Sequence, residues 1–441
     1  MNSLILDFSN SGISAEEHSE EQRKLLPYSE TLHDIIARKD FSAEEASLCL
    51  LSDNESFSKI KKCITEFKKP TLKYVVVIGI GGSNLGTLAI YDALFGTQDV
   101  CVKERLPKLL FLDTTSEEKL TAVIKLLEKE KSANSFVINI ISKSGTTTET
   151  IVNFEVLYGA LSKKFKGLEK RVVVTTDFKS PLWEIAEQRG FAHLSIPKKV
   201  GGRYSVFSAV GLFPLGLVGV KIKDLLTGAW AMQERCLSFG GTEENPAAVG
   251  AVILNTMRER NISIHNNFFF APELESLGKW VRQLVGESLG KEHDTDGNVV
   301  HAGITPIVSI GSTDLHSMAQ LYFGGPRDKF TTLVVVEKPA SRLSVPKKQV
   351  FGGLVENIGG KSVFGIMNAT AQGVSTTYQN LSLPYNTIAF SNVSAASLGE
   401  FLQYKMLETM YLAKLMKVNA FDQPNVEIYK QETRKILAKG R

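Results

Sequence analysis

Residues 136–150, FVINIISKSGTTTET, decide the fold class, because a strand, a loop and the start of a helix follow one another there. The mostly β-branched run Val137–Ile141 predicts a buried strand. Five hydroxyl side chains surround Lys143 in the loop that follows, and Gly145 lets its backbone bend inward. If a helix begins near Thr147, its unpaired N–H groups point at the same place. The segment suits a phosphate dianion without a metal, and it has more hydroxyls than the plainer alternative, a helix cap, requires.

The order of apolar strand, small residues and helix recurs along the chain. Strands are predicted at Tyr74–Ile80, Leu106–Asp113, Ser135–Ile141 and Arg171–Thr176, and again at Phe268–Phe270, Ile304–Ile310 and Thr331–Glu337. Because helical segments separate these strands, the fold class is α/β with doubly wound parallel sheets. The loops GIGGSNLG (79–86) and SKSGTTTET (142–150) lie in the first set, and GSTDLH (311–316) lies in the second. Two related α/β units are therefore expected, with ligands beyond the carboxyl ends of their strands.

The 441 residues are too many for one comfortable hydrophobic core, so more than one domain is expected. We predict a helical N-terminal segment that packs on the second domain, a first α/β domain with the phosphate loop, a second α/β domain and a C-terminal helical segment. These parts span residues 1–69, 70–225, 226–415 and 416–441.

The composition is that of an ordinary globular protein, with 43% hydrophobic and 22% charged residues. The net charge of +4 comes from scattered lysines without interleaved aromatic residues, which argues against a nucleic-acid partner. The four cysteines lack the spacing of zinc knuckles or disulfide frameworks. The N-terminus has no signal-peptide pattern, and no apolar run is long enough to cross a membrane. We expect a cytoplasmic protein without membrane contact.

The glycine-rich loop Gly79–Gly86 has two interpretations. It reads G-x-G-x-x-N where a dinucleotide loop has a third glycine, and Asp113 ends the next strand where a ribose-binding acid would lie. Gly82 and Ser83 serve equally well as a close backbone approach to a sugar or a phosphate. The pattern of P-loop ATPases, G-x-x-x-x-G-K-[ST], is absent from the sequence.

Three further residues carry side chains suited to catalysis. Arg203 lies in a glycine-rich turn, where it either stabilises an oxyanion or a phosphate or forms a surface ion pair. Glu287 follows Gln283 by four residues on an amphipathic helix, so the two share a face, and Glu287 is either a general base or an exposed helix acid. His316 follows a strand in the ligand-facing position, and it is the one histidine of the seven so placed.

A metal site is the weaker of two interpretations for residues 293–301. His293 and His301 flank Asp294 and Asp296, which could supply ligands. A polar turn, DTDG, explains the same residues more simply. We therefore predict neither a metal nor a cofactor.

Six motifs together resemble those of the glucose-6-phosphate isomerase (phosphoglucose isomerase) family in its shorter bacterial form. They are GIGGSNLG at 79–86, SKSGTTTET at 142–150, VGGRYSVFSAVG at 200–211, QLVGESLGK at 283–291, GSTDLH at 311–316 and FDQPNVEIYK at 421–430. The motifs occur in the family's order over nearly the whole chain. The resemblance implies two sugar-isomerase (SIS-type) domains, a homodimer with shared active sites, and cofactor-free interconversion of glucose 6-phosphate and fructose 6-phosphate through a cis-enediolate, in glycolysis and gluconeogenesis.

The same resemblance implies roles for individual residues. Glu287 moves the proton between C1 and C2, and Arg203 steadies the enediolate. His316 helps to open the sugar ring, often from the other subunit, and Lys430 assists it. The implied substrate-binding residues are Gly82, Ser83, Ser142, Lys143, Ser144, Thr147, Thr150 and Gln283.

Two positions depart from the family pattern. Asn425 stands where glycine is common, and because asparagine tolerates left-handed backbone angles better than most residues, we expect the turn before Lys430 to survive. Lys198 stands where an acidic or small polar residue often precedes the GGR motif, and we expect a surface change only. A non-catalytic sugar-phosphate sensor and an isomerase that also accepts mannose 6-phosphate are the alternatives. The joint presence of Glu287, His316 and Lys430 argues against the sensor.

Overall fold

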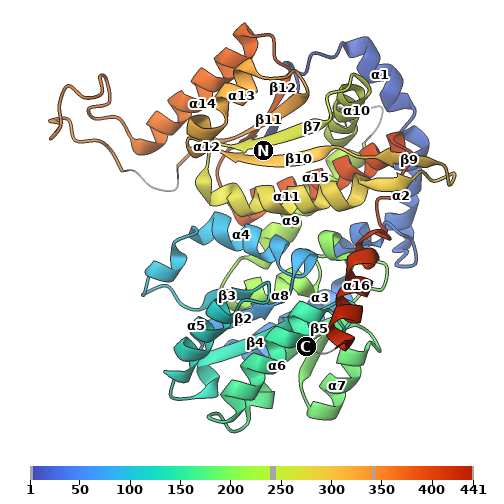
Figure 1. Ribbon diagram of the computed structural model, residues 1–441, viewed down its shortest axis with the longest axis vertical. Helices are drawn as coiled ribbons and strands as arrows, with labels where there is room; N and C mark the ends of the chain where they lie inside the picture. Colours follow the sequence, from blue (N-terminus) through green and yellow to red (C-terminus); the bar gives the residue numbers. More distant parts are fainter. Residues whose placement is uncertain (1–2, 239–244, 340–342, 440–441) are drawn as a thin grey trace.

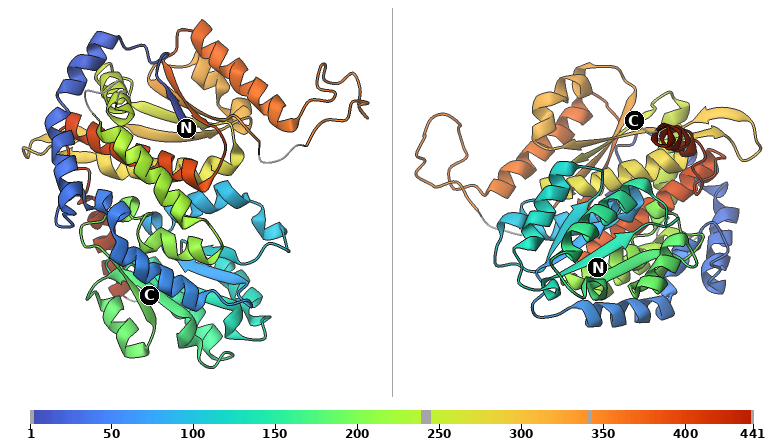
Figure 2. Two further views of the ribbon diagram at one scale, coloured as in Figure 1. Left: turned by 180° about the vertical axis from the view of Figure 1, so that it is seen from behind. Right: turned by 60° about the horizontal axis from the view of Figure 1, so that its bottom comes forward.

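The computed structural model describes residues 3–238, 245–339 and 343–439. These residues form two five-stranded sheets, one in each half of the molecule, and helices cover both faces of each sheet (Figures 1 and 2). The α/β class with doubly wound parallel sheets is confirmed.

The first sheet contains five parallel strands in the order β3-β2-β4-β5-β6. The strands are β2 (Tyr74–Ile78), β3 (Lys108–Leu112), β4 (Phe136–Ile141), β5 (Val172–Asp177) and β6 (Ala192–Ile196). The helices of this half are α3 (Asn54–Phe67), α4 (Leu85–Phe95), α5 (Glu117–Glu128), α6 (Thr148–Ser162), α7 (Pro181–Arg189) and α8 (Ala209–Leu217). The next strand in the chain after β2, β3, lies on one side of β2, and the following strand, β4, lies on the other side. The carboxyl ends of β2 and β4 therefore form the point where the strand order reverses.

The second sheet has the order β1-β12-β11-β7-β10, and only β1 is antiparallel. The strands are β1 (Leu4–Asp7), β7 (Ile264–Phe269), β10 (Thr305–Ile310), β11 (Lys329–Val336) and β12 (Tyr385–Phe390). The helices are α9 (Ile222–Leu237), α10 (Pro246–Glu259), α11 (Glu275–Leu289), α12 (Thr313–Ser317), α13 (Ala319–Gly324), α14 (Val363–Asn380) and α15 (Ala395–Leu415). Its four parallel strands repeat the order of the first four in the other sheet, as the recurring loops predict.

The remaining elements connect or extend the two sheets. They are α1 (Ala15–Arg23), α2 (Leu26–Arg38), the hairpin of β8 (Lys291–His293) and β9 (Val299–Ala302), and the C-terminal helix α16 (Val426–Ala438). Strands β1, β6 and β12 were not predicted from the sequence. The N-terminal segment contacts both halves, because β1 pairs with β12 whereas α3 packs on α8. Helix α9 runs without a break across residue 225, and the domain boundaries stay a prediction.

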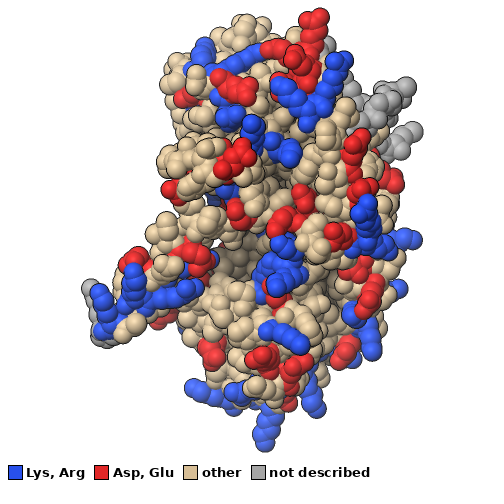
Figure 3. All heavy atoms as spheres, turned by 90° about the vertical axis from the view of Figure 1, so that its right-hand side faces the viewer, with Lys and Arg blue, Asp and Glu red and all other residues tan. Residues whose placement is uncertain are grey.

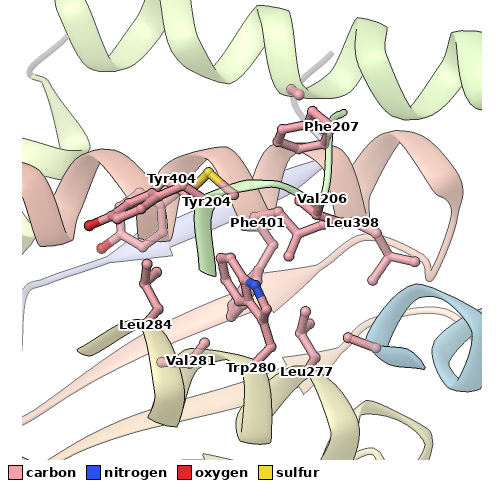
Figure 4. Packing of buried hydrophobic residues seen from close by; sticks show 14 of the residues in the cluster. Tyr204, Val206, Phe207, Leu277, Trp280, Val281, Leu284, Leu398, Phe401 and Tyr404 are labelled. Atoms are coloured by element: carbon pink, nitrogen blue, oxygen red, sulfur yellow. The ribbon is translucent and has the colours of Figure 1, made fainter. Parts of the chain in front are cut away.

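Apolar side chains fill the space where the two halves meet. Trp280 and Leu284 on α11 pack near Phe401 on α15 and near Tyr204 and Val206, which precede α8 (Figure 4). Trp280 and Leu284 are four residues apart and lie on one buried face of α11. Gln283 and Glu287 lie beside this face and are only partly buried, and the packed segment at 204–206 holds the neighbouring arginine against this helix.

None of the described helices is both long and apolar enough to cross a bilayer.

Candidate functional site

The loop after β4 is closed by its own hydroxyl groups. The hydroxyls of Ser142 and Thr147 share a hydrogen bond of 2.9 Å, and those of Ser144 and Thr146 share one of 3.2 Å. Helix α6 begins directly after Thr147, as predicted, and the Thr147 side chain makes no capping hydrogen bond, so the first N–H groups of this 15-residue helix face the loop. The φ of Gly145 is +73°, and a Cβ there would lie 2.9 Å from the backbone nitrogen of Leu182. This loop is an anion site in form, because hydroxyls, helix N–H groups and one lysine converge.

Lys143 supplies the positive charge of the loop. Its Nζ donates to the carbonyl of Lys198 at 2.6 Å, and partial burial lowers the pKa of its ammonium group. The positive charge of Arg203 also lowers the pKa of Lys143, so the arginine and the loop affect each other electrostatically. The hydrogen bond from Lys143 uses only the backbone carbonyl of residue 198, and the exposed side chain of Lys198 agrees with the surface change that we expected. Thr150 is buried on α6, and its hydroxyl oxygen has no hydrogen-bond partner within the described part of the chain.

The loop after β2 lies directly against the turn that carries Arg203. A Cβ added to Gly82 would fall 2.1 Å from the backbone carbon of Gly202. A Cβ on Gly81 would fall 2.7 Å from the amide nitrogen of Gln283. The small residues that suggested a dinucleotide loop are thus needed for close contact with the protein's own backbone, and Asp113 forms an ion pair with Lys119 at 2.7 Å. Ser83 follows in this loop and is partly exposed.

Arg203 is buried, so the interpretation as a surface ion pair is wrong. Its side chain is 1% exposed, and its guanidinium directs all five N–H groups to oxygen atoms. Nε donates to Ser288 Oγ at 2.8 Å, and Nη1 donates to Glu287 Oε2 at 3.2 Å and to Gln423 Oε1. Nη2 donates to the carbonyls of Ala420 and Asp422 at 2.6 and 3.1 Å. One side chain therefore joins the first half, α11 and the segment before α16.

Glu287 is the accessible member of this group. Its side chain is 31% exposed, and its two carboxylate oxygens accept from different partners: Oε2 from Arg203, and Oε1 from Gln283 Nε2 at 2.9 Å. The predicted sharing of a helix face by Gln283 and Glu287 is confirmed. A carboxylate held at both oxygens and open on one side is well placed to take and return a proton. Figure 3 shows one face of the molecule hollowed between the two halves, with both basic and acidic side chains around the hollow.

His316 lies at the other end of the second sheet from Glu287. The amino end of β10 lies beside Glu287, because a Cβ on Gly286 would contact Pro306 at 3.9 Å. His316 comes six residues after the carboxyl end of β10, on α12, and it is exposed. Five residue steps along the strand span roughly 17 Å. One chain therefore does not bring His316 to the carboxylate.

Lys430 lies on α16, and its Nζ pairs with Glu427 Oε1 at 2.7 Å. No residue of α16 that the structure describes is buried. Asn425 has right-handed helical angles, φ −66° and ψ −21°, so the chain enters α16 there without the left-handed backbone that asparagine would tolerate. Its amide donates to Glu292 at 2.8 Å instead, which explains why this turn needs no glycine.

The alternative of a metal at residues 293–301 is not supported by the local geometry. Asp294 Oδ1 accepts from the backbone N–H groups of Asp296 and Asn298 at 2.9 and 2.8 Å. The polar turn is confirmed, since this carboxylate is used to shape the β8–β9 connection. Within the described ranges no three His, Cys, Asp or Glu side chains form a group able to hold a metal ion.

Sequence reasoning missed several residues that hold the site together. Ser288 and Gln423 bind the arginine, and Lys291 donates to the carbonyls of Glu287 and Asp422 at 2.8 and 2.6 Å. Burial lowers the pKa of the Lys291 ammonium group. All of them lie inside the quoted motifs QLVGESLGK and FDQPNVEIYK, and Lys291 is four residues after Glu287. Helical spacing could have found the lysine, whereas Gln423 is 220 residues from its partner and left no local signal.

Comparisons with known proteins bear on the whole chain. The sequence profile of the family described as Phosphoglucose isomerase matches residues 58–441. A glucose-6-phosphate isomerase of Carboxydothermus hydrogenoformans is 33% identical over 390 residues, which cover 87% of this chain and 83% of the relative. One from Thermus thermophilus is 33% identical over 393 residues, which cover 88% and 89%.

Two solved structures are similar in fold. A hypothetical protein of Thermus thermophilus has a TM-score of 0.83 at 30% identity and covers 99% of this chain and 100% of its own. A glucose-6-phosphate isomerase of Chlamydia trachomatis has a TM-score of 0.75 at 18% identity, with 99% and 89% covered.

Proposed function

The chain belongs to the phosphoglucose isomerase family, and from this premise we propose how its residues interconvert glucose 6-phosphate and fructose 6-phosphate. The reaction is an aldose–ketose isomerisation through a cis-enediolate, a step of glycolysis and gluconeogenesis. The observation that carries the assignment of roles is the pairing of one accessible carboxylate, Glu287, with the buried Arg203 and Gln283.

The phosphate group binds the loop after β4. Lys143 and the hydroxyls of Ser142, Ser144 and Thr147 surround the N-terminus of α6, and Thr150 lies one turn further along. Binding there fixes the far end of the substrate, so that C1 and C2 are held for the chemical step. Gly82, Ser83 and Gln283 line the path from this loop to the carboxylate.

Glu287 removes a proton from one of the two carbons and returns it to the other. Its hydrogen bonds at both oxygens fix the direction of the lone pairs, and its open side faces the substrate. The guanidinium of Arg203 provides the fixed positive charge for the oxygen that becomes negative in the enediolate. Because its five N–H groups are all engaged, direct contact requires the 3.2 Å bond from Nη1 to Glu287 to be exchanged for one to the substrate.

The ring of the sugar phosphate must open before the proton is moved. We assign this step to His316 and Lys430. Lys430 reaches the sugar by leaving Glu427, an exposed partner three residues earlier on the same helix. Since His316 lies at the far end of the second sheet, we assign it to the active site of a second copy in a homodimer.

An apolar arm supports the homodimer. Residues 343–362 extend away from the body before α14 (Figures 1 and 2), and the arm is closed at its base by a hydrogen bond of 2.9 Å from Val345 to Lys361. Val350, Phe351 and Leu354 on it are three-quarters or more exposed. Large apolar side chains on an extended arm are stable when another surface covers them. The four free cysteines accord with the reducing cytoplasm that we propose as its location.

A direct assay tests the activity. Purified protein is given fructose 6-phosphate in the presence of EDTA, and glucose 6-phosphate is measured in quenched samples with a separate dehydrogenase. We expect rapid conversion that EDTA does not reduce. An absence of conversion, with fructose 6-phosphate still raising the melting temperature, would indicate the sensor. Mannose 6-phosphate in the same assay determines whether the C2 epimer is also a substrate.

Mixing two inactive variants tests the shared site. Glu287→Gln and His316→Ala chains are combined, unfolded partly and allowed to reassociate. If each site takes its histidine from the other copy, mixed dimers regain one competent site. Mixtures that stay inactive while forming dimers would place His316 in its own subunit's site.

A further inference from the structure

Asp177 lies beside the phosphate loop and has no place in the mechanism above. It is the last residue of β5, the strand next to β4, and its backbone N–H donates to the carbonyl of Lys143 at 3.1 Å. Thr176 donates from its hydroxyl to the carbonyl of Ser142 at 2.6 Å. The end of β5 thus holds the backbone of the loop, and it brings a carboxylate next to the lysine that binds the phosphate.

The Asp177 carboxylate has few hydrogen bonds and few nearby positive charges for a partly buried acid. Its Oδ1 is buried and accepts no hydrogen bond from any residue that the structure describes. The charged groups that act on it are Lys143 and Lys198, the lysine that departs from the family pattern. Burial outweighs their attraction and raises the pKa of Asp177 to about 6. The side chain is therefore ionised at neutral pH but close to gaining a proton.

On the basis of the proposed phosphate site, we propose that Asp177 is a positioning residue that weakens phosphate binding through Lys143 and so speeds the release of the sugar phosphate. A phosphate dianion in the loop and the Asp177 carboxylate are both attracted to Lys143, and the two negative groups repel each other. Binding therefore favours the protonated carboxyl. The phosphate affinity falls as the pH rises through 6, and the remainder of the site keeps its geometry.

Sulfate is the probe of choice, because it stays doubly charged from pH 5 to pH 8. Its inhibition constant against fructose 6-phosphate is compared between the protein and Asp177→Asn. We expect equal constants at pH 5 and roughly tenfold tighter sulfate binding by the variant at pH 8, with the change centred near pH 6. The variant keeps the backbone N–H that holds the loop, so the loop geometry is preserved while the charge is removed.

Asp113→Asn is the matched control. Asp113 follows β3 at the same edge of the same sheet, but it is partly exposed and paired with Lys119. Removal of this charge should alter sulfate binding by less than about twofold at either pH.

Two results would overturn the proposal. Equal sulfate binding by the protein and Asp177→Asn at pH 8 would exclude a repulsive role, and weaker binding by the variant would mean that Asp177 holds Lys143 in place. Calorimetric titration with sulfate gives the same comparison without activity, so a protein that fails to isomerise sugar phosphates is distinguished from one in which Asp177 is inert. Asp177→Ala repeats the test if the amide disturbs folding.

Discussion

The two sheets share one order of parallel strands, but different residues follow the carboxyl ends of their central strands. In the first half, the carboxyl ends of β2 and β4 are followed by the glycine loop and the hydroxyl loop that form the anion site. In the second half, β7 is followed by Phe270, which is buried and stacks on Phe268 with ring centroids 4.7 Å apart. Strand order creates a suitable edge, and the residues placed after the strands decide whether it binds a ligand.

The second half contributes residues to the site from the other end of its sheet, where its parallel strands begin. Helix α11 runs back along β10, so its C-terminal end, with Gln283 and Glu287, reaches the glycine loop of the first half. The phosphate site and the base therefore belong to different halves. Arg203 spans the junction, and changes to each part should separate binding from chemistry.

The largest effect should follow from the second half alone. Glu287→Gln removes the base but keeps the shape, so kcat should fall by a factor on the order of 10³ while sulfate binding stays within about twofold. Steady-state kinetics and calorimetry measure the two quantities. Glu275→Gln, at the exposed start of the same helix, is the control and should keep full kcat. An unchanged kcat for Glu287→Gln would remove the carboxylate from the mechanism.

Arg203→Met should affect both chemistry and stability, because the side chain joins the halves. We expect kcat to fall on the order of 10²-fold. We also expect a stability loss of about 3 kcal/mol, because the buried acceptors on Ser288 and Ala420 lose a charged donor. Urea unfolding and kinetics report the two losses.

Arg171→Met provides the contrast for this substitution. Arg171 is also buried, but it donates to the carbonyls of Phe67 and Phe136 inside the first half. Its loss should lower stability and leave kcat of the folded protein intact. Equal kcat losses in the two variants would mean that Arg203 acts only through folding.

A change confined to the first half should weaken binding without affecting the base. Gly145→Ala places a Cβ 2.9 Å from Leu182 at a φ of +73°, so the hydroxyl loop must shift. KM for fructose 6-phosphate should rise roughly tenfold, equivalent to about 1.4 kcal/mol. Gly297→Ala meets no atom within 4 Å at a φ of +86° and should cost only about 1 kcal/mol of stability. A similar KM for both variants would contradict the steric argument.

The smallest effect concerns stability near the anion site. The pKa of Asp177 is raised in the folded chain, so its ionisation disfavours folding above pH 6, and this cost disappears as the pH falls toward 4. Asp177→Asn should therefore raise the melting temperature by about 1–3 °C at pH 8 and by progressively less toward pH 4. Calorimetric scans at both pH values check the sign, and a lower melting temperature at pH 8 would reverse it.

Local signals made much of the first half predictable. The strand, loop and helix of residues 136–150 are contiguous, and Gln283 and Glu287 are related by helical spacing, so each could be found from neighbours in sequence. The burial of Arg203 was not predictable, because its partners are 84 to 220 residues away. Strand β1 was missed because its pairing with β12 depends on a strand near the other end of the chain. His316 was found by its loop, but only the geometry of β10 shows that it lies away from the base.

The long-range hydrogen bonds of Arg203 have a consequence for the synthesis of the protein. Three of its five hydrogen bonds go to residues after position 419, so they form only after the strands of both sheets have been synthesised. A nascent chain that has folded both sheets still lacks three acceptors of this buried cation, although Arg203 and Gln283 can already bind Glu287. The junction between the halves is therefore completed only after both sheets, and we expect a chain cut short before residue 420 to have a less stable junction.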